Sequence, residues 1–360
     1  MTAPAPASPP GDSSDSSSAG STGSPGGSPG SPAGTVLGVG AAVAGGFGAA
    51  GQTRINGSLA EHVGSGLGAA VVSFGSGLVL LLVALACWPG ARAAVARVVG
   101  ALRSGRLRWW EVLGGTAGGF YVAAQGLTAA TLGVALFMVA VVAGQSTSSL
   151  FVDRFGLAPG GVRLITLGRA LGPVLTVTAV AIAVSGSVGT VPSVGLAVIP
   201  FFAGAFQSWQ QAVNGRVRAV AEAPRDPFTG VAAATFGNFV VGTTALLLAF
   251  GVSTLAVGPP TGTLPTQWPL DLVLYSGGLL GITFIAIQAA VVHRIGVLLL
   301  ALGMIAGQIV AALVIDVVVP GVAAPGPAMY AGAVLTLMAV SVPVAESWLL
   351  RRRARTRRPG

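Results

Sequence analysis

The segments AVVAGQSTSSLFVD at 140–153 and GMIAGQIVAALVID at 303–316 carry the same polar pattern inside apolar sequence. Each contains Ala-Gly-Gln, and in each an aspartate follows the glutamine by eight residues. The two glutamines, Gln145 and Gln308, lie 163 positions apart. Two copies of one pattern indicate that the chain is built from an internal repeat.

The repeat extends over most of the chain, with a slightly smaller offset near the start of each half. The matched elements are Gly114-Gly115 with Gly277-Gly278, Gln125 with Gln288, Ser73-Phe74-Gly75 with Thr235-Phe236-Gly237, and the pair Gln52 and Asn56 with the pair Gln210 and Asn214. A four-residue insertion after Asn214 accounts for most of the change in offset. We therefore expect two repeats, at 35–187 and 188–350, between a tail at 1–34 and a basic tail at 351–360.

The composition indicates a membrane protein. Hydrophobic residues make up 53% of the chain and charged residues 8%, against about 25% charged in a typical soluble domain. The apolar residues fall in runs of about twenty, the length that spans a bilayer as a helix, whereas barrel strands are about ten residues long and alternate in polarity. We predict an all-α membrane protein with ten transmembrane helices. The expected spans are 35–60, 66–88, 109–129, 132–153, 161–185, 190–214, 229–251, 271–291, 295–318 and 327–350.

The arginines predict the orientation of these spans. All 19 basic residues are arginines, and seventeen of them fall on the side of the membrane that holds the N-terminus. By the positive-inside rule this side is cytoplasmic, and both termini lie there. The run from Arg351 to Arg358 is expected to rest on anionic lipid of the inner leaflet. Because each half has five spans, an odd number, the second half enters the membrane upside down, so the halves should be inverted-topology repeats.

Two segments outside the spans differ from the rest. Residues 1–34 are almost wholly Ser, Gly, Pro, Ala and Thr, and such a segment cannot bury enough surface to offset its ordering entropy, so we expect a disordered cytoplasmic tail. Residues 91–108 carry arginines on one face and apolar residues on the other. This pattern fits a short interfacial helix or a cytoplasmic extension of the second span.

The residues also exclude several classes of function. The chain has no lysine, and a Walker ATPase needs one after the glycine of its loop, as a Schiff-base enzyme needs one for its chemistry. The glycines at 114–119 lie within a span, where small residues let helices approach closely. We expect no nucleic-acid partner, because the arginines lie between apolar runs. His62 and His293 are far apart in the sequence, so we expect no metal site and no cofactor.

The spacing of the polar residues resembles that of a known family. The first half reads Q-x-x-x-N in its first span, S-F-G in its second, G-G-x-x-G in its third and A-G-Q-x-x-x-S-L-x-x-D in its fourth. It resembles the YdcZ-type inner-membrane exporters of the drug/metabolite transporter superfamily, and the whole chain looks like a tandem fusion of two five-helix units. The second half lacks the Ser-Leu after Gln308. The resemblance implies a ten-helix fold in a bacterial inner (cytoplasmic) membrane and the movement of small molecules, and it names no substrate.

Six amide side chains are the candidate substrate contacts. An amide in a membrane span offers both hydrogen-bond donors and acceptors to a solute in a central cavity. The alternative remains open that the same groups join helices through interhelical hydrogen bonds or cap helix ends. The candidates are Gln52, Asn56, Gln145, Gln210, Asn214 and Gln308, with Gln125 and Gln288 as a weaker pair.

Three charged residues complete the candidate site. Arg169 falls about eight residues into the fifth expected span, where a charge costs roughly 2.5–3.5 kcal/mol. It would bind an anionic substrate, or it would serve a structural role by binding carbonyls or Asp153. Asp153 and Asp316 are candidates for proton coupling at opposite membrane faces, with a solvated ion pair or a loop anchor as the alternative for Asp153.

The sequence therefore predicts a secondary transporter, and specifically an exporter. It would move a small metabolite or drug-like molecule by alternating access between the repeats. The alternative is a membrane-embedded enzyme or lipid-handling protein that uses the same cavity. The spans contain few ionisable groups, which acid–base and nucleophilic catalysis require, so we expect no catalytic residues. We expect the chain to work as a monomer in the lipid bilayer.

Overall fold

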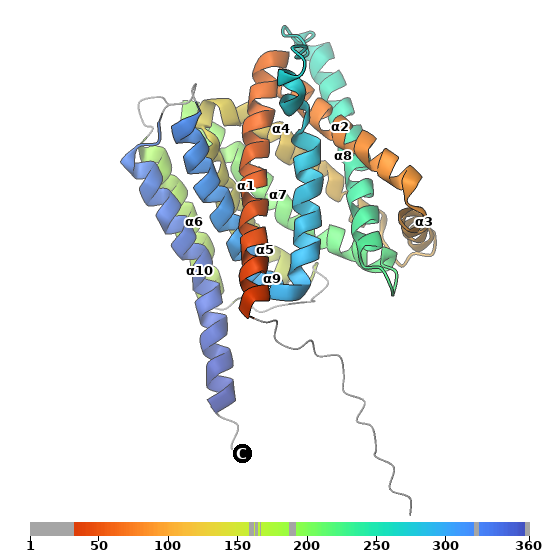
Figure 1. Ribbon diagram of the computed structural model, residues 1–360. Helices are drawn as coiled ribbons and strands as arrows, with labels where there is room; N and C mark the ends of the chain where they lie inside the picture. Colours follow the sequence, from red (N-terminus) through yellow and green to blue (C-terminus); the bar gives the residue numbers. More distant parts are fainter. Residues whose placement is uncertain are drawn as a thin grey trace, which may run out of the picture.

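The computed structural model describes residues 32–157, 162, 165, 167–186, 192–319 and 324–356. These ranges are built from α-helices joined by short connections, with two 3₁₀ helices, η1 and η2 (Figure 1). The expected tail at 1–34 lies outside the described residues up to residue 31. The elements are α1 (Pro32–Val63), α2 (Gly66–Cys87), α3 (Pro89–Arg103), η1 (Trp109–Val112), α4 (Gly114–Leu132), α5 (Val134–Arg154), α6 (Leu167–Ser185), α7 (Pro192–Ala221), α8 (Phe228–Val257), η2 (Leu270–Tyr275), α9 (Gly277–Val318) and α10 (Pro327–Thr356).

Large apolar side chains cover the outside of the bundle. Leu248 and Leu255 on α8 are 68% and 90% exposed, and Val83 on α2 is 59% exposed. Among the described residues, five helices are long and apolar enough to cross a membrane: Gly34–Val63, Gly66–Cys87, Val134–Arg154, Phe228–Val257 and Leu300–Val318. The chain is a multi-pass membrane protein, because only a lipid solvent favours so much exposed apolar surface.

Two long helices that are not among these five, α4 and α7, are central. The glycine-rich helix α4 packs against α1, α2, α7 and α8, and α7 packs against α4, α5 and α8. Tyr121 to Gln125 on α4 are all buried. The low hydropathy of these helices follows from their position, since they face other helices rather than lipid.

The expected spans 271–291 and 295–318 belong to one continuous helix, α9, that folds back on itself. A Cβ built on Gly45 of α1 would lie 3.3 Å from Ile287 and 2.8 Å from Met304. These two residues are 17 apart, or about 25 Å along a straight helix, so α9 must turn sharply between them. Figure 1 shows α9 descending beside α1 and turning near its label. The second half thus keeps two helical arms where two separate spans were expected.

The two halves meet through a pair of close helix crossings that repeat each other. On α1 and α9, a Cβ on Gly46 would overlap the carbonyl oxygen of Met304, and a Cβ on Gly307 would overlap that of Val43. On α7 and α5, Gly204 meets the carbonyl oxygen of Val141, and Gly144 meets that of Phe201. The second set lies at the equivalent positions of the other half, at offsets of 158 and 163. Each crossing therefore joins the first helix of one half to the fourth helical segment of the other.

The second helix of each half shows that the expected alignment there is wrong by three residues. Gly278 packs on the carbonyl oxygen of Ser73, and its counterpart Gly115 packs on that of Asn238. The structural counterpart of Ser73 is therefore Asn238, not Thr235, and SFGSG at 73–77 aligns with NFVVG at 238–242. The insertion after Asn214 is accordingly seven residues long. The shared Phe-Gly letters gave a false match, because the contact with the Gly-Gly helix sets the register.

Residues 89–103 form the separate helix α3, which decides against an extension of the second span. Helix α2 ends before Trp88, whose backbone is extended, and Pro89 begins the new helix. Ala94 on α3 is buried against Ala221 and Ala233 of α7 and α8. The Arg97 guanidinium donates to the carbonyl oxygen of Ala221, at 2.9 Å from Nε and 2.6 Å from Nη2, and so closes the end of α7.

Candidate functional site

A cavity of about 320 Å³ lies between residues of both halves, a size typical of small-molecule sites. The first half contributes α1, α2 and α4, and the second half contributes α7, α8 and α9. Its lining consists of Ala49, Gln52, Phe74, Gly118, Tyr121, Val122, Gln207, Gln210, Gln211, Asn214, Gly215, Arg218, Val231, Ala234, Thr235, Asn238, Phe239, Gly281, Phe284, Ile285, Gln288 and Leu300.

Helix α7 supplies most of the polar wall. Gln207, Gln210, Gln211 and Asn214 all line the cavity, and their spacing of three, four and seven residues puts them on one helix face. Arg218 continues the same stripe by one turn. The predicted site includes Gln210 and Asn214 but not Gln207 and Gln211, although the helical spacing within QSWQQAVN indicates that all four share one face.

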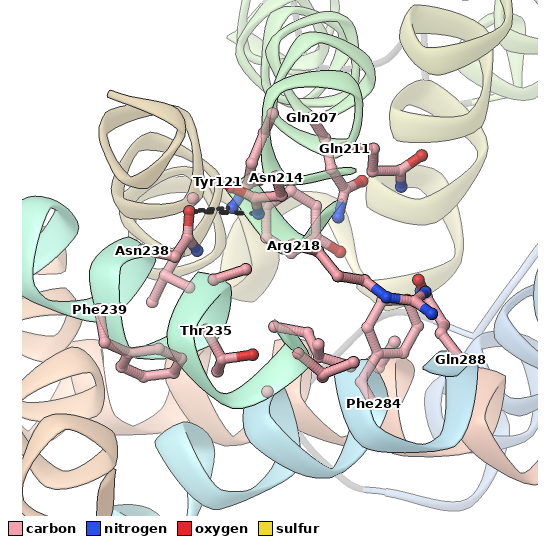
Figure 2. A pocket seen from close by; sticks show the side chains of 18 of the residues that line it. Tyr121, Gln207, Gln211, Asn214, Arg218, Thr235, Asn238, Phe239, Phe284 and Gln288 are labelled. Atoms are coloured by element: carbon pink, nitrogen blue, oxygen red, sulfur yellow. Dashed lines mark hydrogen bonds between the residues drawn. The ribbon is translucent and has the colours of Figure 1, made fainter. Parts of the chain in front are cut away.

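Hydrogen bonds hold amides of the lining in place on three helices, α7, α8 and α1. Asn238 on α8 accepts from Gln210 Nε2 at 3.0 Å and from Asn214 Nδ2 at 3.4 Å (Figure 2). Across the cavity, Gln52 Nε2 donates to the carbonyl oxygen of Gly277 at 2.9 Å. The orientation of the Gln52 amide is thereby fixed, because a backbone carbonyl only accepts.

Aromatic side chains supply the apolar part of the lining. Phe74 and Phe239 stack with their ring centroids 4.8 Å apart and an interplanar angle of 27°. Phe284 and Tyr121 also line the cavity. The site therefore combines flat apolar surface with amide groups, the mixture that orients a small ligand within an apolar pocket.

The centre of the cavity is symmetric with respect to the two halves. Six pairs of lining residues occupy equivalent positions, and both members of each pair line the cavity. The pairs are Ala49 with Gln207, Gln52 with Gln210, Phe74 with Phe239, Gly118 with Gly281, Tyr121 with Phe284, and Val122 with Ile285. The cavity thus lies where the two halves face each other.

The mouth of the cavity is not symmetric. In the first half, the seam between α1 and α4 is closed, because Asn56 Nδ2 donates to Gln125 Oε1 at 2.6 Å and Gln125 Nε2 donates to Thr53 Oγ1 at 2.8 Å. These three side chains are fully buried, and we call them the α1–α4 seam.

The equivalent residues of the second half are Asn214, Gln288 and Gln211, which we call the α7–α9 seam. All three line the cavity, and Figure 2 shows Gln288 on α9 apart from Gln211 and Asn214 on α7, with the Arg218 side chain extending toward Gln288 in this view. No hydrogen bond joins the three in the described structure. One seam is therefore closed and its counterpart is open.

The remaining predicted amides lie outside the lining. Gln145 is half-buried, and its Nε2 donates to Oε1 of Gln207, so it supports the polar wall from behind. Gln308 is buried, and its Oε1 has no hydrogen-bond partner in the described structure. The position equivalent to Gln207 in the first half is Ala49, which explains why the pairing made by Gln145 has no counterpart at Gln308.

The predicted charged residues lie at helix ends. Asp316 is buried, and its two oxygens accept from the backbone N–H groups of Val134 at 2.9 Å and Ala135 at 2.7 Å, at the start of α5. Asp153 is half-buried near the end of α5. Arg169 is the third residue of α6, because that helix begins at Leu167 and not near 161, so it lies in the first turn. The Arg169 side chain is outside the described residues.

The described lining offers little to a catalytic or metal centre. Arg218 is the one charged residue among the lining residues that the structure describes, and its Nε lies 3.3 Å from Glu222 Oε2. No group of three His, Cys, Asp or Glu side chains is placed to hold a metal within the described ranges.

Comparison with known proteins agrees with the repeat and the fold. The family model described as "Putative inner membrane exporter, YdcZ" matches twice, at residues 37–182 and 195–342. The chain belongs to the YdcZ family. It contains two tandem copies of the YdcZ unit, as the repeat at 163 predicted, and the family places it among membrane transporters of the drug/metabolite superfamily.

One solved structure has a similar fold. It is described as "Crystal structure of protein", aligns with a TM-score of 0.51 at 16% identity, and covers 89% of this chain and 98% of that chain. Among curated proteins, none matches this chain.

Proposed function

We propose that this YdcZ-family chain is a secondary transporter, working as an exporter, that carries a small solute through the central cavity by alternating access. The supporting observation is that the centre of the cavity is formed by six equivalent pairs, while its mouth is formed by one half alone. A site on the symmetry axis remains intact when the two halves exchange conformations. The mouth, in contrast, changes sides.

The two seams form the gate in this proposal. In the alternate state, Asn214 and Gln211 would bond to Gln288 as Asn56 and Thr53 bond to Gln125 in the described state. The α1–α4 seam would open at the same time. The two states would then contain the same kinds of bonds, so a solute that binds in the centre need shift their equilibrium only slightly.

The arginines supply the orientation. Arg218 lines the cavity beside Gly215 and Val231, at the end of α7 and the start of α8. This connection belongs to the arginine-rich side, which we place in the cytoplasm with both termini. The described state is then open to the cytoplasm. The proposal includes ten spans in two inverted repeats at 35–187 and 188–350, in a single chain that acts as a monomer, since one chain encloses the whole cavity.

The amides that line the centre are proposed to bind the solute directly. Asp153 and Asp316 are not among the described residues that line the cavity, and neither they nor Arg169 are proposed as solute contacts. Asp316 caps α5 in the described structure, so any coupling role there would require it to leave two backbone N–H groups. The enzyme alternative gains no support from the described lining, which lacks the acid–base pair or activated nucleophile that catalysis uses.

Cysteine labelling from each side of the membrane tests alternating access without a known substrate. In a Cys87→Ala background, Ala49→Cys places a thiol in the centre of the cavity, and a membrane-impermeant maleimide is applied to vesicles of each orientation. We expect labelling from both sides. Two variants serve as controls. Val231→Cys, at the cytoplasmic mouth, should react only from the cytoplasmic side. Ala60→Cys, at the other end of the pathway, should react only from the outer side. Labelling of Ala49→Cys from one side alone would refute the proposal.

A further inference from the structure

We propose that the solute is uncharged and planar and presents N–H or O–H donors to Gln52 and Gln210 at the centre of the cavity. The inference rests on the proposed function, because it takes this cavity as the transport site. It adds the chemical class of the solute and the two atoms that bind it, Gln52 Oε1 and Gln210 Oε1.

The carbonyl oxygens of the two central glutamines are available to a ligand. Gln52 and Gln210 are both more than nine-tenths buried and both line the cavity. Their Nε2 groups are committed, to the Gly277 carbonyl oxygen and to Asn238 Oδ1. Within the described structure neither Oε1 receives a hydrogen bond. Neither oxygen is among the fully buried atoms without a partner, so both are accessible from the cavity, and an occupant with two donor groups could hydrogen-bond to both.

The two glutamines occupy equivalent positions in the halves, on α1 and α7, and both line the centre of the cavity. A flat solute can therefore present one donor to each. Because the pair maps onto itself when the halves exchange, the same two contacts persist in both states of the carrier.

The charges around the cavity disfavour ionic solutes. An anion at the centre would meet the two Oε1 atoms, which are acceptors and repel it. A cation would find no carboxylate among the described lining residues and would have to pass the Arg218 guanidinium. Aromatic rings attract cations, but Phe74 and Phe239 stack on each other, and the desolvation of an unpaired charge outweighs that attraction. An uncharged solute carries neither penalty.

The shape of the lining favours a planar apolar body. Four aromatic residues stand in two equivalent pairs around the centre: Phe74, Phe239, Tyr121 and Phe284. The cavity of about 320 Å³ accommodates a fused two-ring solute. Flat rings with N–H donors at their edge combine both requirements, since aromatic surfaces stack with modest gain while the edge reaches the amides.

Four naphthalene probes of nearly equal size separate charge from hydrogen bonding. They are 2-naphthamide, N,N-dimethyl-2-naphthamide, 2-naphthoate and 2-naphthamidine, bound to the purified full chain in lipid nanodiscs and measured by naphthalene fluorescence against empty nanodiscs. We expect 2-naphthamide to bind at least about fivefold more tightly than each of the other three, the loss that one or two hydrogen bonds produce. Equal or tighter binding of the anion, the cation or the dimethylamide would overturn the inference, as would the absence of binding by all four.

Matched variants assign the effect to the two oxygens. Gln52→Met and Gln210→Met remove the amide at similar volume, and each should weaken 2-naphthamide about fivefold. Gln308→Met, a buried glutamine outside the lining, should not change it. If a variant does not fold, the probe series on the unsubstituted chain still decides. The Ala49→Cys labelling needs no ligand, so the two proposals can fail separately. Labelling from both sides, with 2-naphthamide not the tightest-binding probe, would reject the solute class and leave transport standing. Labelling from one side alone, with 2-naphthamide the tightest-binding probe, would reject transport alone.

Discussion

Breaking the α1–α4 seam should shift the carrier toward its alternate state. Gln125→Leu removes two hydrogen bonds, to Asn56 at 2.6 Å and to Thr53 at 2.8 Å, from a fully buried position. Interhelical bonds of this kind contribute about 0.6–1 kcal/mol each in membranes. The described state should therefore lose about 1.2–2 kcal/mol relative to the alternate state, which lacks these bonds. Since 1.4 kcal/mol is a factor of ten, the ratio of alternate to described state should rise about 7-fold to 30-fold.

Ala60 provides the readout for this shift. It is 7% exposed and stands at the position equivalent to Arg218, which lines the open mouth. In a Cys87→Ala background, the labelling rate of Ala60→Cys from the outer side measures the population of the alternate state. Gln125→Leu should raise that rate about 7-fold to 30-fold, whereas Gln288→Leu, the same change at the equivalent position, should lower it or leave it unchanged. An unchanged rate in a folded Gln125→Leu protein would refute the gating role of the seam.

Three further changes test the scaffold. Gly144→Ala should destabilise the protein by about 1–3 kcal/mol, because the new Cβ would overlap the Phe201 carbonyl oxygen; Gly48→Ala, which meets open space, should cost nothing in the same thermal-unfolding assay. Glu111→Gln should cost about 1 kcal/mol, since it breaks the 2.6 Å ion pair with half-exposed Arg216 but keeps an acceptor for the Arg108 N–H; an unchanged melting temperature would count against this. Asp316→Asn should cost about 1 kcal/mol by weakening the cap on α5 and should leave proton-driven transport intact; loss of that transport with stability unchanged would show a coupling role.

The repeat and part of the site could be predicted from the sequence, because they depend on composition and periodicity. The runs of apolar residues fixed the membrane class, and the equal spacing of Gln52 with Asn56 and of Gln210 with Asn214 placed these residues at equivalent positions. Three of the four lie in the cavity lining. The fourth, Asn56, is in the closed seam, and nothing in its sequence context distinguishes it from Asn214.

Other features depend on tertiary contacts that the sequence does not carry. Asn238 was missed because its register is set by the packing of Gly115 against it, and the similar letters at 235–237 pointed elsewhere. The fold-back of α9 was expected as a loop, yet the helix continues through the turn. The predicted position of Arg169, eight residues into its helix, was wrong, because an apolar run does not show where a helix begins.

The lining also bears on the direction of transport. When the halves exchange, the central pairs stay, but the mouth residues Gln211, Arg218 and Asn238 are replaced by their counterparts Thr53, Ala60 and Ser73. The cytoplasmic mouth is therefore the more polar of the two, and a polar solute should bind more tightly from that side. In a carrier without a coupled ion, this difference in affinity must be offset by the equilibrium between the two empty states, since binding shifts populations but cannot drive flux against a concentration gradient. The asymmetry thus sets the solute concentration at which the site fills from each side of the membrane. Export against a concentration gradient would require a titrating or ion-binding group that moves with the seams, and the central amides, which carry no charge, cannot supply it.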